Sequence, residues 1–194
     1  MPPVPDDPEV LFASYLPERF AGAQSLLGNT SSVGSLLFRV DGVGEWSLRL
    51  RDGSLETVRT MEDDVVLQVT VSREDFSVLV VEALERLEAS DRPLTKASAF
   101  RGLKQDPETA RLVRHVPGSV LLVLRDGDVK RRLLVTPGRR KADFTGAECT
   151  VECGLADWVE AETGVKSPID LFVGGKLKVA GNVQIGMALA GALA

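Results

Sequence analysis

Two segments of this chain share one pattern, an alternating strand pair bounded by glycines, and this pattern constrains the fold more than any other feature. The first strand pair is expected at 34–42 and 45–53, and the second at 118–124 and 131–138; the spacing from Gly42 to Gly53 and from Gly127 to Gly138 is 11 residues in both. In the first, Trp46, Leu48 and Leu50 alternate with polar residues. Alternation with period two predicts strands that bury one face. Asp-Gly pairs are typical of tight hairpin turns, so the sequence predicts two antiparallel hairpins.

Each hairpin sits in a similar succession of elements. An Asp-Pro-Glu helix start precedes it, at residues 7–9 and 106–108. A further strand follows it, at 65–71 and roughly 148–153, and each strand runs into a helix. The sequence therefore predicts an α+β fold with a mainly antiparallel, mixed β-sheet covered by helices. It predicts two approximate repeats, 7–105 and 106–194, and leaves open whether they share one core.

Composition excludes several classes of function. The 194 residues are 44% apolar and 26% charged, which suits a globular core. A net charge of −5 argues against a nucleic-acid partner. The single histidine excludes His-centred triads and multi-histidine zinc sites, and Cys149 and Cys153 cannot build a disulfide framework. We expect no enzyme activity, no catalytic residue, no metal and no cofactor.

The two ends of the chain carry no sign of a targeting or membrane segment. The first eight residues are rich in Pro and Asp, and the longest apolar stretch, roughly 179–194, falls short of the ~20 residues of a membrane span. A soluble, cytoplasmic protein is therefore expected. Arginine outnumbers lysine 16 to 7, which is typical of a GC-rich bacterial genome.

The C-terminal stretch carries a more specific signal. It reads Ser-Pro-Ile-Asp-Leu-Phe-Val-Gly-Gly-Lys-Leu-Lys-Val-Ala-Gly-Asn over residues 167–182, and Met187-Ala188-Leu189 follow in an apolar helix expected at 183–193. A proline, a phenylalanine, Gly-Lys-Leu-Lys, a β-branched residue and Gly-Asn before a helix resemble the signature of the sterol carrier protein-2 family. Residues 93–104 repeat this ending weakly, and Arg131 stands where the second hairpin would carry the tryptophan of the first.

The resemblance implies a domain that binds a sterol, a fatty acyl chain or another small apolar ligand in a tunnel between the sheet and its helices. It assigns the lining to seven apolar residues: Trp158, Phe172, Leu177, Val179, Ile185, Met187 and Leu189. A different class of function stays open, an interaction or regulatory module that uses this fold without a cavity. Such a module would dock on a partner or form a homodimer.

Charge is distributed unevenly along the chain. Residues 1–100 carry 9 basic against 17 acidic side chains, whereas residues 101–194 carry 14 against 11. Six basic residues cluster at the second hairpin: Lys130, Arg131, Arg132, Arg139, Arg140 and Lys141. They indicate either a solvated sheet edge that resists aggregation or a surface for transient contact with an anionic membrane or with the acidic first half.

Overall fold

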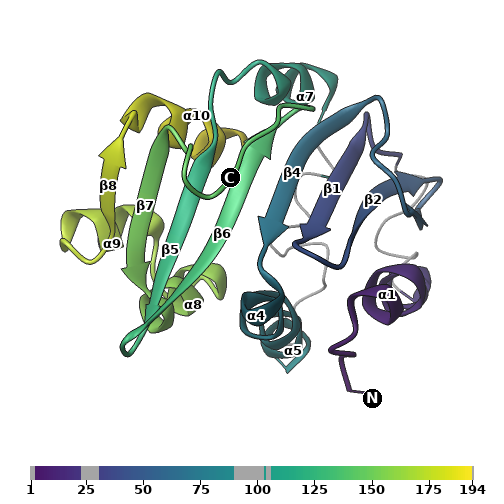
Figure 1. Ribbon diagram of the computed structural model, residues 1–194, viewed down its shortest axis with the longest axis horizontal. Helices are drawn as coiled ribbons and strands as arrows, with labels where there is room; N and C mark the ends of the chain where they lie inside the picture. The colour runs from purple at the N-terminus through teal and green to yellow at the C-terminus, as the bar shows by residue number, and fades with distance from the viewer. Residues whose placement is uncertain (1–2, 23–30, 90–102, 104–105, 194) are drawn as a thin grey trace.

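An eight-stranded sheet forms the centre of the computed structural model, which describes residues 3–22, 31–89, 103 and 106–193 (Figure 1). The strand order is β3-β2-β1-β4-β6-β5-β7-β8. The strands are β1 (Ser35–Val40), β2 (Gly44–Arg51), β3 (Ser54–Val58), β4 (Val65–Val71), β5 (Val120–Asp126), β6 (Val129–Pro137), β7 (Cys149–Gly154) and β8 (Lys178–Gly181). Neighbours are antiparallel except for the pairs β1/β4 and β5/β7, which are parallel. The predicted α+β fold with a mixed, mainly antiparallel sheet is confirmed.

Helical segments lie before, between and after the strands. In chain order they are α1 (Pro8–Val10), η1 (Leu11–Tyr15), α2 (Leu16–Gly22), α4 (Arg73–Phe76), η2 (Ser77–Val81), α5 (Glu82–Ala89), α7 (Pro107–Arg114), α8 (Leu155–Glu162), α9 (Pro168–Val173) and α10 (Val183–Leu193). Both Asp-Pro-Glu motifs start a helix as expected, because the carboxylates of Asp7 and Asp106 each accept two backbone N–H groups of the first turn. In the part of the chain that the structure describes, no helix is long and apolar enough to span a bilayer.

The glycine spacing read from the sequence marks the turns. Gly42, Gly53, Gly127 and Gly138 all adopt a positive φ, between 58° and 79°. Glycine enters this region without the steric cost that a Cβ imposes, so it ends each strand at a fixed residue. The two hairpins, β1/β2 and β5/β6, form where the alternation predicts them.

The strand orders of the two halves correspond. The first half contributes β2-β1-β4 and the second contributes β6-β5-β7, in each case a hairpin plus a strand parallel to its first member. The two sets join through antiparallel pairing of β4 with β6, from Leu67↔Pro137 to Val71↔Leu133. One sheet therefore runs through both halves. An internal repeat stays a prediction, and its weak echo at 93–104 lies, apart from Leu103, outside the described residues.

The sheet has one face covered by helices and one covered by loops. Alternate strand residues such as Phe38, Leu48 and Val69 belong to one buried cluster together with side chains of η1, α2, α5, α7 and α10. The intervening residues, such as Gln68, face the other way and meet the loops 59–64 and 138–148 instead. The second face is more polar, because Ser47, Gln68, Thr70 and Thr136 are buried there.

Candidate functional site

The C-terminal helix α10 rests on the helix-covered face through two side chains. Ile185 and Leu189 are 4% and 3% exposed, one helical turn apart, and they belong to the main buried cluster together with Cys149 of β7. Gly118 lets the helix approach, since a Cβ there would stand 2.5 Å from Ile185 Cδ1. Met187 lies on the opposite side of α10 and is 70% exposed. The structure thus brings Ile185 and Leu189 to the sheet and turns Met187 toward solvent.

Helix α8 covers the other end of the same strands (Figure 1). Its Trp158 is partly buried and packs, with Leu155 and Leu177, against a small buried cluster of Leu122, Leu124 and Cys153. No side chain of α8 is fully buried. Trp158 and Leu177, both expected from the sequence to line a site, are therefore neighbours at the Cys153 end of β7.

Between these two helices the apolar core is interrupted. The cluster under α10 and the cluster under α8 are joined by side chains that are only partly buried, Leu79, Leu133 and Val151. Val151 stands midway along β7 between Cys149 and Cys153, and Val179 of β8 pairs with it. We call this surface, formed by Leu133, Val151, Trp158, Leu177 and Val179, the apolar strip.

Helix α9 presents further apolar side chains to solvent. It begins with a capping box, in which Ser167 Oγ accepts from the Asp170 N–H and the Asp170 carboxylate accepts from the Ser167 N–H. Leu171 is its buried anchor, at 1% exposure. Phe172 is 56% exposed and Val173 is 80% exposed. Phe172 therefore lies on the outside of α9, away from the core contact that Leu171 makes.

The titratable groups at the strip favour an uncharged surface. Burial, reinforced by the negative charges of Asp157 and Glu152, raises the pKa of the Cys153 thiol to about 11. Burial also raises the pKa of Cys149. Both thiols are therefore neutral near pH 7, and each behaves as a small apolar side chain. Within the described residues, no three His, Cys, Asp or Glu side chains gather in a way that could hold a metal ion.

An ion pair joins residues that neighbour Leu177 and Trp158 in the sequence. The Lys176 ammonium lies 2.6 Å from a carboxylate oxygen of Asp157, which joins the loop after α9 to α8. Donation to Asp157 raises the pKa of Lys176. The pair is half exposed on the lysine side, so solvent limits its contribution to stability.

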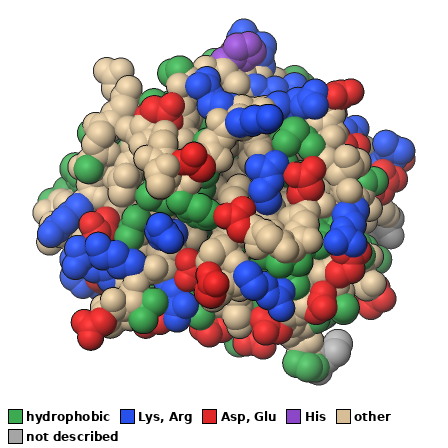
Figure 2. All heavy atoms as spheres, in the orientation of Figure 1, with side chains coloured by type: hydrophobic (Ala, Val, Ile, Leu, Met, Phe, Trp, Pro, Cys, Tyr) green, Lys and Arg blue, Asp and Glu red, His purple; other side chains and the backbone are tan. Residues whose placement is uncertain are grey.

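The six basic residues of the second hairpin do not form one patch. Arg131 is committed to ion pairs with Asp75 and Asp126, and Arg132 stacks over the Phe144 ring. Basic and acidic side chains are interspersed over much of the visible face (Figure 2). Arg139, Arg140 and Lys141 instead line a pocket with Arg39 and Gln68. Sequence reasoning missed these last two, although a polar residue between two apolar neighbours in a largely apolar strand was the available signal.

A family profile and two solved structures match this chain. The profile of the SCP-2 sterol transfer family matches residues 98–194, half of the chain. Among curated proteins no match is found. The apo form of sterol carrier protein 2 from Yarrowia lipolytica is 21% identical, with 45% of this chain and 74% of that chain aligned and a TM-score of 0.35. Sterol carrier protein 2 like 2 from Aedes aegypti is 18% identical, with 56% and 94% aligned and a TM-score of 0.37. By the profile match over α7 to α10, the chain belongs to the SCP-2 sterol transfer family.

Proposed function

We propose that this protein binds and transfers a lipid of the sterol or fatty acyl type, without catalysis, and that the lipid lies along the apolar strip between α8 and α10. Membership of a sterol transfer family supports lipid binding in general. The observation that carries the location is the interrupted core, because partly exposed Leu133, Val151 and Leu177 are surface that an apolar ligand would cover.

The energetics of such a site are favourable without polar recognition. Burying an acyl chain contributes ~0.8 kcal/mol per methylene. The same partly exposed side chains gain contacts when the ligand covers them. Neutral Cys149 and Cys153 line the two ends of the strip, so no buried charge opposes an apolar chain. Micromolar affinity, about −8 kcal/mol, is within reach of one lipid tail.

The seven residues expected from the sequence take different parts in this proposal. Trp158, Leu177 and Val179 contact the ligand directly, since they lie on the strip. Ile185 and Leu189 hold α10 against the sheet and so form one end of the site. Phe172 and Met187, both exposed, act at the outer surface, where a lipid leaves a membrane.

An interaction module is the second candidate function, and α9 favours it. Ile169, Phe172 and Val173 are 72%, 56% and 80% exposed on one short helix, and clustered apolar exposure marks docking surfaces. We also predict that the protein forms a homodimer and is located in the cytoplasm. The experiment below separates the two functions.

A matched pair of valine substitutions tests the lipid site. Val151→Thr keeps the shape of the side chain and places a hydroxyl in the middle of the strip. Val123→Thr makes the same change on the adjacent strand, but Val123 aligns with Glu152 and faces the loop-covered side. We expect cis-parinaric acid, followed by fluorescence and native mass spectrometry, to bind the wild type and the Val123→Thr variant alike.

Binding to the Val151→Thr variant should weaken about tenfold, because covering an unpaired hydroxyl costs roughly 1–3 kcal/mol. Thermal unfolding of both variants controls for stability. If the wild type binds neither cis-parinaric acid nor a sterol more tightly than 100 μM, roughly −5.5 kcal/mol, the lipid proposal is wrong and the interaction module takes its place.

A further inference from the structure

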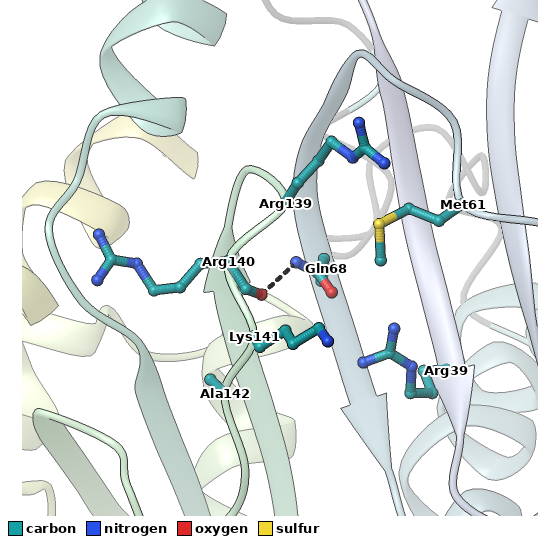
Figure 3. Close-up of a pocket in the computed structure, with 7 residues that line it drawn as sticks. All are labelled: Arg39, Met61, Gln68, Arg139, Arg140, Lys141 and Ala142. Carbon is teal, nitrogen blue, oxygen red and sulfur yellow. Dashed lines mark hydrogen bonds between the residues drawn. The ribbon is translucent and has the colours of Figure 1, made fainter.

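A second recess lies on the loop-covered face of the sheet, away from the apolar strip. It has a volume of about 510 Å³ and is lined by Arg39, Met61, Gln68, Arg139, Arg140, Lys141 and Ala142 (Figure 3). Arg39 comes from β1, Gln68 from β4, and the three consecutive basic residues from the loop that follows β6. The pocket therefore forms where the first and second halves of the chain meet.

Gln68 connects the sheet to the loop that lines this pocket. The residue is 2% exposed, and its Nε2 donates to the carbonyl oxygens of Gly138 at 2.7 Å and Arg140 at 2.8 Å. These two bonds fix the loop backbone over β4, so that Arg139, Arg140 and Lys141 are held around the recess. A buried amide with two backbone partners is a rigid support, because breaking either bond leaves a buried polar group unsatisfied.

The charges that line the pocket are all positive. Arg39 pairs with Glu45 at 2.9 Å, and Arg139 pairs with Asp63 at 2.7 Å, although Asp63 is 96% exposed. Within the part of the chain that the structure describes, neither Arg140 nor Lys141 has an ion pair. Arg140 acts electrostatically on Glu148, so among the described residues Lys141 is the pocket cation that has no carboxylate partner.

Three basic side chains, those of Arg39, Arg139 and Lys141, lie around the recess in Figure 3, whereas the Arg140 side chain points away and only its backbone carbonyl faces Gln68. In Figure 3 the Lys141 ammonium and the Arg39 guanidinium approach one another over the Gln68 amide, and Arg139 and Met61 close the opposite side. A sheet edge that resists aggregation needs its charges exposed and separated. Convergence of like charges on one recess is unfavourable unless an anion occupies it.

We propose that this pocket binds a phosphate group carried on an organic molecule, a phosphomonoester. The unpaired Lys141 ammonium and the nearby Arg39 and Arg139 guanidiniums offer positive charge to a phosphomonoester dianion, and its tetrahedral oxygens can accept from donors that arrive from several directions. Met61 and Ala142 supply an apolar wall for the organic part. The source is either a small soluble phosphomonoester or the headgroup of an anionic lipid such as phosphatidic acid.

Two binding measurements on the full chain distinguish the sources. Glycerol 3-phosphate titrated by calorimetry reports on a soluble ligand. Co-sedimentation with phosphatidylcholine vesicles that contain phosphatidic acid, compared with vesicles of phosphatidylcholine alone, reports on a headgroup. Binding in either measurement supports the pocket and names its source, whereas binding in neither overturns the proposal.

Matched charge variants show whether the pocket itself is responsible. Lys141→Gln removes a cation from the pocket, and Lys130→Gln removes one from the start of β6, so both change the net charge equally. We expect Lys141→Gln to weaken binding about tenfold or more, as loss of one charge-assisted hydrogen bond predicts. Lys141→Arg should retain most of the affinity, and Lys130→Gln should bind as the wild type does.

Equal losses in Lys141→Gln and Lys130→Gln would show a diffuse charge effect and would overturn the assignment. The Val151→Thr variant serves as a further control, since its altered residue faces the helix-covered side of the sheet. Phosphate binding that is unchanged in Val151→Thr keeps this site separate from the proposed lipid site, so either proposal can fail without the other.

Discussion

Truncation of three side chains on α10 measures how this helix is held to the sheet. The structure places Ile185 and Leu189 against β7 at 4% and 3% exposure, and it leaves Met187 70% exposed between them. We consider Ile185→Ala, Leu189→Ala and Met187→Ala, three changes on one helix that each remove three heavy atoms. Because the helical environment is shared, differences in stability report burial.

The expected magnitudes follow from that burial. Truncation of a fully buried Ile or Leu costs about 2–4 kcal/mol through lost transfer free energy and the cavity left behind. A helix of 11 residues is marginal on its own, so Ile185 and Leu189 supply much of its attachment. With roughly a third of its surface covered, Met187 should lose only about 0.5–1 kcal/mol.

Urea unfolding followed by circular dichroism gives the free energy of unfolding of each variant without lipid. Hydrogen exchange at the α10 amides shows whether the helix detaches locally before the sheet unfolds. We expect faster exchange in the Ile185→Ala and Leu189→Ala variants, and exchange close to wild type in Met187→Ala. A Met187→Ala variant as destabilised as the other two would refute the orientation of α10 described above.

Three further predictions follow from single residues. Burial raises the pKa of Tyr15 to about 12. The stability that this residue contributes is therefore complete below its unfolded pKa near 10 and is lost as the pH rises through 12. Absorbance titration of this sole tyrosine measures the shift, and equal midpoints in the folded and the urea-unfolded protein would contradict it. Asp75→Asn should lower the free energy of unfolding by about 1–3 kcal/mol, because Asp75 links α4 to Arg131 of β6. Spectroscopic probes placed in the two halves should still report the same urea midpoint. Separate midpoints would show that the halves unfold independently. Gly181→Ala should destabilise the protein by more than about 2 kcal/mol, because φ is +79° and a Cβ would collide with the backbone before β7. Gly175→Ala, at φ +69° in open space, should cost about 1 kcal/mol. Equal shifts in thermal midpoint would argue against the close β7/β8 contact.

Local structure was predictable from the sequence because its causes are local. An aspartate before proline is a favourable helix start, and Asp7 and Asp106 each cap a helix here. Positive φ at Gly42 and Gly127 follows from the turn chemistry of each hairpin. Alternating apolar residues specify which strand face lies toward the helices, as at Trp46 and Leu48, but they predicted an exposed second face, whereas Ser47 is buried on the side that the loops cover.

The sequence did not predict which side chains of α10 face the core. Apolar and small residues surround the whole of this helix in the sequence, so hydrophobic periodicity does not single out one face. Packing against Cys149 and Gly118 selects Ile185 and Leu189 and leaves Met187 outside. The same reasoning applies to Phe172, since only contact with the core distinguishes it from the adjacent Leu171.

The sequence by itself determined most of the strands, the two hairpins, the helix starts and the family resemblance, because these depend on neighbouring residues and on short ordered motifs. The edge strand β3 was not among the predicted strands. Tertiary structure alone decided that β4 pairs with β6 in one sheet, that the core is interrupted along β7, and that Arg39 and Gln68 meet the 139–141 loop. Such contacts join residues far apart in the chain, and their partners are chosen by burial and hydrogen bonding in the folded state, which no local pattern records.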